Sequence, residues 1–61
     1  MPGETPLTGR EREVALLVSQ GLSNREIGQR LVIAEGTANV HVKHILHKLG
    51  LRRRSQLAVW V

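Results

Sequence analysis

Residues 21–50, GLSNREIGQRLVIAEGTANVHVKHILHKLG, decide the fold of this 61-residue chain. Ser23 and Glu26 have the spacing of a capping box, in which a hydroxyl and a carboxylate satisfy free backbone N–H groups at a helix start. The spacing therefore predicts a short helix over residues 24–31. Gly28 lies inside that helix although glycine costs about 1 kcal/mol there relative to alanine. We therefore expect Gly28 to let another helix approach closely.

The second helical segment of this stretch has one apolar side and one polar side. We expect it to begin near Glu35 and to end at about Leu49, because Gly50 can adopt the left-handed conformation that closes a helix. Residues 32–34 form a tight apolar connection, with Ile33 between the flanking helices. Four apolar residues recur at i, i+4, i+7 and i+11 and are expected to face the core: Ala38, Val42, Ile45 and Leu49. A short capped helix followed by an amphipathic one is typical of a helix-turn-helix.

One helix is expected on each side of this pattern. Thr8 and Glu11 have the spacing of another capping box, and Gly21 can end the helix that follows. Residues 55–61 form a short helix that is apolar around most of its surface. No segment alternates between apolar and polar residues as a strand does. The predicted fold is all-α, with four helices.

Length and composition restrict the possible classes of protein. Residues 7–61 are long enough for one small domain, and residues 1–6, rich in Pro and Gly, are interpreted as a linker or an expression remnant. The chain has no cysteine, which excludes disulfides and thiolate zinc clusters. It has neither an apolar run of about 18 residues nor a signal peptide, so we expect no membrane partner and a cytoplasmic location.

The charge of the chain favours a polyanionic partner. Nine Lys and Arg residues stand against five Asp and Glu residues. Residues 35–54 hold five of the cations and one of the anions, in the half that contains the amphipathic helix. A basic helix face is usually only solvated. Here, however, the basic face belongs to the second helix of a helix-turn-helix, and a helix in that position fits the major groove of DNA. Asn39 can pair with adenine, Lys43 can donate to guanine, and Val40 can contact a thymine methyl group.

Three histidines on the same helix allow two interpretations. His41, His44 and His47 recur at i, i+3 and i+6, which spreads them over roughly 120° of the helix surface. We therefore predict no metal site. His41 is expected to be half-buried at the edge of the core, whereas His44 and His47 can contact phosphate, more strongly when protonated.

Four separated blocks resemble the LuxR-type helix-turn-helix domains of bacterial transcription regulators. They are LTGREREV from Leu7, GLSNREIGQRL from Gly21, TANVHVKHILHKLGL from Thr37 and RSQLAVWV from Arg54. They match in order and at the right spacing over almost the whole chain. The segments VHVKHILHKL and AVWV are most similar to the output domain of nitrate-responsive two-component regulators.

The resemblance implies a double-stranded DNA partner and a role for each of the last two helices. The third would be the recognition helix, with Asn39, Val40 and Lys43 facing the bases. Phosphate contacts would come from Ser23, Asn24, Arg25, Thr37 and Lys48, in addition to His44. The fourth helix would form a homodimer through Leu57, Trp60 and Val61. Such a dimer would place two recognition helices about 34 Å apart on an inverted repeat, and the full-length regulator would contact RNA polymerase.

The chain departs from the family pattern at three positions. Ala34 stands where the family usually has a Ser or Thr helix cap, so the third helix should start less firmly. Gly36 loosens the same turn. Asn39 replaces a common Lys, which should change the preferred base. The resemblance also gives structural roles to Glu11 and Arg54, and we expect these two side chains to form an ion pair.

The sequence leaves two alternatives open. The apolar last helix could make the chain a protein-interaction module whose basic face is only solvated. A promoter-recognition domain of a sigma factor shares the helix-turn-helix plan, although the GLSNREIGQRL block and the apolar last helix argue against it. The chain contains no Ser/His/Asp arrangement, phosphate-binding glycine loop or paired carboxylates, so we predict that it is not an enzyme and that it needs no cofactor.

Overall fold

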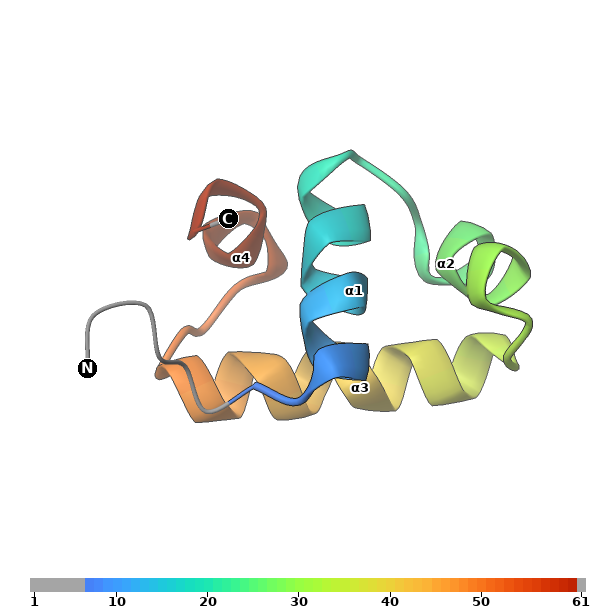
Figure 1. Ribbon diagram of the computed structural model, residues 1–61. Helices are drawn as coiled ribbons and strands as arrows, with labels where there is room; N and C mark the ends of the chain where they lie inside the picture. The colour runs from blue at the N-terminus through green and yellow to red at the C-terminus, as the bar shows by residue number, and fades with distance from the viewer. Residues whose placement is uncertain (1–6, 61) are drawn as a thin grey trace.

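The computed structural model describes residues 7–60 and consists of four helices (Figure 1). They are α1 (Gly9–Ser19), α2 (Asn24–Leu31), α3 (Glu35–Leu49) and α4 (Arg54–Trp60). The longest helix, α3, lies along one side of the molecule, α1 stands across it, and α2 and α4 lie on either side of α1 (Figure 1). This is the predicted all-α, four-helix fold. The predictions for residues 1–6 and for Val61 fall outside the described residues.

Both predicted capping boxes are present. At the start of α1, the Glu11 amide donates to Thr8 Oγ1 over 3.2 Å and the Thr8 amide donates to Glu11 Oε1 over 2.9 Å. At the start of α2, the Glu26 amide donates to Ser23 Oγ over 3.2 Å and the Ser23 amide donates to Glu26 Oε1 over 2.8 Å. These four hydrogen bonds fix where α1 and α2 begin.

The turn between α2 and α3 depends on a close backbone approach. The Ile33 amide donates to the Gly28 carbonyl over 2.9 Å, and a Cβ atom added to Gly28 would lie 2.7 Å from the carbonyl oxygen of Ile33. Gly28 therefore does permit a close approach, as predicted, but what approaches is the backbone of the turn. Val32 closes α2 in the left-handed conformation at φ 58° and ψ 49°. Ala34 begins α3 without a side-chain cap, as predicted.

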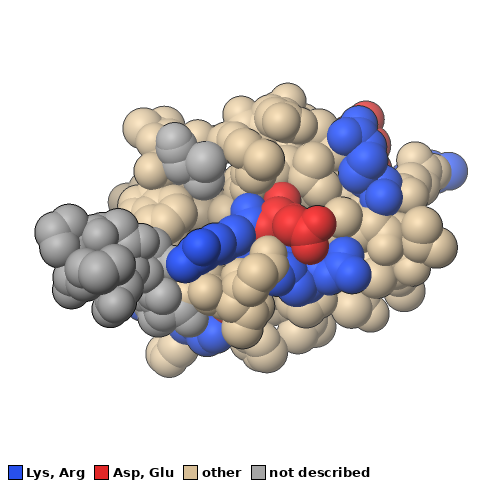
Figure 2. Space-filling view, viewed as in Figure 1, with Lys and Arg blue, Asp and Glu red and all other residues tan. Residues whose placement is uncertain are grey.

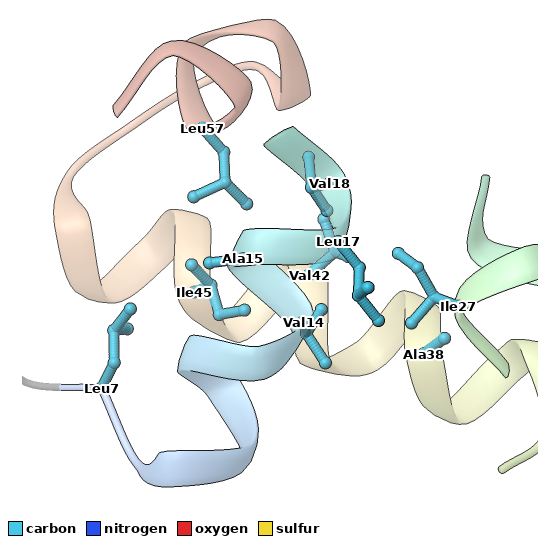
Figure 3. Packing of buried hydrophobic residues seen from close by; sticks show 10 residues of the cluster. All are labelled: Leu7, Val14, Ala15, Leu17, Val18, Ile27, Ala38, Val42, Ile45 and Leu57. Carbon is cyan, nitrogen blue, oxygen red and sulfur yellow. The ribbon is translucent and has the colours of Figure 1, made fainter. Parts of the chain in front are cut away.

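The core joins all four helices (Figure 3). Its largest fully buried side chains come one from each helix: Val14 from α1, Ile27 from α2, Ile45 from α3 and Leu57 from α4. The expectation that Leu57 contacts a second copy is therefore wrong for this conformation, because Leu57 packs between α1 and α3 of its own chain. The apolar surface that α4 leaves open comes from Val59 and Trp60 instead.

Candidate nucleic-acid interface

The outer side of α3 is the candidate interface. None of the other described helices covers the side of α3 that faces away from α1 (Figure 1). At about 100° per residue, Val40, Lys43 and His47 lie on the side of α3 opposite the buried Val42 and Ile45. All three are exposed. Two of the three predicted base-contacting residues, Val40 and Lys43, thus share one accessible face.

The third of them, Asn39, lies at the edge of that face, next to α2. Its Oδ1 accepts a hydrogen bond from Nδ2 of Asn24 over 3.2 Å. Asn24 Oδ1 in turn accepts from Nη1 of Arg54, and Nη2 of Arg54 donates to the Leu22 carbonyl over 2.7 Å. A predicted base contact and a predicted phosphate contact are therefore joined by one hydrogen-bond chain that ends at α4.

The expected ion pair between Glu11 and Arg54 is absent. Glu11 Oε1 instead accepts from Lys48 Nζ over 2.8 Å. Glu11 lies in the first turn of α1 beside the C-terminal half of α3, where Lys48 is, whereas Arg54 extends toward the loop before α2. Charge complementarity alone could not decide which cation reaches this carboxylate.

Glu11 is a buried carboxylate, only 5% exposed. The hydrogen bond from Lys48, followed by that from the Thr8 backbone, lowers the pKa of Glu11 below its ordinary value, against the opposing effect of burial. Glu11 therefore remains ionised and holds the Lys48 ammonium group at the end of α3. The Lys48 ammonium group, which is predicted to contact a phosphate, thus already has a carboxylate partner in the free domain.

The other predicted phosphate-contacting residues, apart from His44, occupy the N-terminal ends of α2 and α3. Ser23 caps α2 and is exposed, as is Arg25 in the first turn of that helix. Thr37 lies in the first turn of α3, and His44 lies further along it; both are exposed. The hydrogen bond between Asn24 and Asn39 brings the two helix ends together.

The chain carries a formal net charge of +4. Figure 2 shows one face of the molecule, on which Lys and Arg side chains flank a central acidic area and partly cover a second one at the upper right. His41 is partly buried, as expected, while His44 and His47 are exposed.

Within residues 7–60, no group of three or more His, Cys, Asp or Glu side chains is placed to hold a metal ion. No helix in the same part of the chain is long and apolar enough to cross a membrane.

A capped helix, a three-residue turn and a longer helix with an accessible outer side define a helix-turn-helix domain. Residues 5–61 match the family model described as bacterial regulatory proteins, luxR family. The chain belongs to this family and is a DNA-binding helix-turn-helix domain of the kind found in transcription regulators. The family is not a class of enzymes.

Three relatives illustrate where such domains occur. The chain is 53% identical over 55 residues to the nitrate/nitrite response regulator protein NarL of Escherichia coli (strain K12), covering 90% of this chain and 26% of that protein. It is 44% identical over 54 residues to the DNA-binding transcriptional activator DevR/DosR of Mycobacterium tuberculosis (strain ATCC 25618 / H37Rv), covering 88% and 25%. It is 42% identical over 60 residues to the transcriptional regulatory protein LiaR of Bacillus subtilis (strain 168), covering 98% and 28%. The chain thus spans about a quarter of the length of these curated relatives.

Two features of the interface were not found by sequence reasoning. One is the chain of hydrogen bonds through Arg54, Asn24 and Asn39; the other is the pair between Glu11 and Lys48. Both join residues that are 15 or more positions apart, so no local spacing indicates them.

Proposed function

We propose that residues 7–61 form the output domain of a bacterial transcription regulator and bind specific double-stranded DNA sequences. The observation that carries the proposal is the uncovered outer side of α3, where Val40 and Lys43 are exposed with Asn39 at the edge. The major groove of B-DNA admits an α-helix, and its base edges present hydrogen-bond donors and acceptors and the thymine methyl group. Helix α3 is thus the recognition helix.

Phosphate contacts position this helix in the groove. Six side chains at the start of α2 and along α3 make these contacts: Ser23, Asn24, Arg25, Thr37, His44 and Lys48. Three of them, Ser23, Asn24 and Lys48, also have hydrogen-bond partners within the domain. Lys48 donates to Glu11 in the free domain, so a phosphate would add to that ion pair or displace it. Neutralising several phosphates makes the affinity fall steeply with salt concentration.

The apolar surface of α4 supports binding as a dimer. Val59 and Trp60, 86% and 44% exposed, lie beside Leu51 along a shallow, mostly apolar depression. Two copies meeting there, with Val61 as a further contact, would present two α3 helices to half-sites about 10 bp apart on an inverted repeat. RNA polymerase is the expected further partner of the full-length regulator.

The exposed side chains of α4 also favour a second candidate function, a protein-interaction module that acts without DNA. The mass of the domain in solution, with and without a DNA duplex, separates the two. A dimer that forms equally well without DNA and does not bind duplexes would favour the interaction module.

Selection from a randomised duplex pool at near-physiological salt tests the proposed function. We expect enrichment of an inverted repeat with half-sites about 10 bp apart. Lys43→Ala should then lose about 1–3 kcal/mol of discrimination at one base pair, whereas Arg12→Ala, which removes an exposed cation from α1, should keep the preference. Retention of DNA with no enriched sequence would refute specific recognition by this domain.

A further inference from the structure

The hydrogen bonds around Asn39 fix which end of its side-chain amide faces outward. A guanidinium group only donates hydrogen bonds, so the atom of Asn24 that meets Arg54 is its acceptor, Oδ1. The Nδ2 group of Asn24 is then the one that faces Asn39. An N–H donor requires an acceptor, and Asn39 therefore turns its Oδ1 inward, toward α2.

The remaining group of Asn39 is the Nδ2 amide, which carries two N–H donors. Asn39 is only partly buried, and within residues 7–60 its Nδ2 has no hydrogen-bond partner. Arg54 is itself held by the Leu22 carbonyl, so the whole chain of donors has a fixed direction, from α4 through α2 to α3. At the edge of the recognition surface, Asn39 presents donors while its acceptor is engaged.

We propose that Arg54 and Asn24 are positioning residues that hold the donor end of Asn39 toward the DNA, so that Asn39 selects guanine. The inference rests on the proposed function of α3. In the major groove, guanine presents two acceptors, O6 and N7, whereas cytosine presents a donor. Oδ1 has a second lone pair, but it is turned toward Asn24, whereas a bidentate pair with adenine requires Oδ1 and Nδ2 to face the base edge together. The expected base therefore differs from the adenine that an isolated asparagine favours.

The substitution Asn24→Asp reverses the direction of the chain without changing the size of the side chain. One carboxylate oxygen accepts from Arg54 and the other faces Asn39. Asn39 must then turn its Nδ2 inward and its Oδ1 outward, which matches the cytosine amino group. Position 24 is the first residue of α2, where a negative charge is favourable, so the variant is expected to fold.

The experiment measures affinity ratios on matched duplexes. Asn39→Ala first identifies the base pair that position 39 reads, as the one where the preference disappears. At that pair the unaltered domain should bind guanine at least about 10-fold more tightly than cytosine, and Asn24→Asp should abolish or reverse this ratio. Gln29→Glu adds the same charge to an exposed position of α2 and should weaken both duplexes equally. An unchanged ratio in Asn24→Asp overturns the inference and leaves the proposed function intact.

A second measurement needs no DNA. By NMR of the free domain, side-chain amide hydrogens of Asn24 should exchange with water more slowly than those of Asn39. In Asn24→Asp, those of Asn39 should become the protected ones. If the side-chain amide hydrogens of Asn39 exchange with water at the same rate in both proteins, the inference is overturned. Failure to enrich any sequence would count against the proposed function, while this exchange measurement would still test the orientation of the amide.

Discussion

The starts of α1 and α2 differ from the turn that joins α2 to α3. Each of those two helices begins at a complete capping box. The turn has neither of the usual local signals, because Val32 occupies a left-handed position that favours glycine and Ala34 supplies no cap. Local chemistry therefore specifies where α1 and α2 begin, whereas local signals do not specify the turn that sets the angle of α3.

The difference shows that tertiary packing holds the helix-turn-helix turn in place. Gly28 admits the Ile33 carbonyl at a distance that no other residue type permits, and the Ile33 side chain packs against the core. A domain of this length buries only about 60% of the surface that its unfolded chain exposes and is therefore marginally stable. Each unfavourable local feature of the turn should therefore cost a measurable fraction of the free energy of unfolding of the domain.

The largest effect is expected for Gly28→Ala. The new Cβ would meet backbone atoms of the turn, at 2.7 Å from Ile33 O, and overpacking of this kind typically costs 1–3 kcal/mol or more. The gain in helix propensity, about 1 kcal/mol, offsets part of it. We expect a net loss of about 2 kcal/mol in the free energy of unfolding, measured by urea denaturation. Gly36→Ala is the matched control, because nothing lies within 4 Å of its added Cβ, and it should stabilise. Equal effects at both positions would contradict the close approach.

The two capping boxes differ in the burial and the partners of their carboxylates. Glu11 is buried and bonded to Lys48, whose side chain is 36% exposed, whereas Glu26 is exposed. Glu11→Gln keeps the shape and removes the charge, so we expect a loss of about 1–2 kcal/mol, toward the lower end for charged hydrogen bonds because solvent screens Lys48. Glu26→Gln should cost less. Thermal unfolding at pH 7 measures both.

The pH dependence of stability follows from the same carboxylate. Because the pKa of Glu11 is lowered on folding from an ordinary value of 4.5, its contribution is complete above pH 4.5 and is lost as the pH falls through the folded-state pKa. Acid should therefore narrow the stability gap between the unaltered domain and Glu11→Gln. A gap that stays constant down to pH 2 would show that the charge of Glu11 does not stabilise the fold.

The features that the sequence predicts are those that depend on a few neighbouring residues. The helix bounds of α1, α2 and α3 follow from caps, glycines and periodicity, all of which act within a few residues. The partner of Glu11 depends on how α1 packs against α3, and the burial of Leu57 depends on how α4 packs against the other helices. No local pattern encodes either of them. The outer face of α3 is predictable because its periodicity is local, whereas the orientation of the Asn39 amide depends on Arg54, 15 positions away in sequence.

Supplying the missing cap should make the start of α3 resemble those of α1 and α2. In Ala34→Ser, the hydroxyl can accept from a free backbone N–H in the first turn of α3, which is worth about 1 kcal/mol. For a domain of this size, that raises Tm by roughly 4–8 °C. Ala34→Val changes the same exposed side chain without adding an acceptor and should give no such gain. A serine variant no more stable than the valine variant would show that the turn cannot use a local cap.

The smallest effect is expected at Val32, the other departure in the turn. The left-handed conformation costs an L-residue roughly 1–2 kcal/mol, and Val32 is 90% exposed, so little burial is lost on replacement. Val32→Gly removes that cost but adds about 0.5–1 kcal/mol of backbone entropy, leaving a net gain of about 0.5 kcal/mol. Val59 is equally accessible, at 86%, but helical, so Val59→Gly should destabilise. Urea denaturation measures the change in the free energy of unfolding for both substitutions. Changes of opposite sign would locate the strain in the backbone of the turn. A loss of stability at both positions would mean that Val32 stabilises the turn through contacts of its side chain.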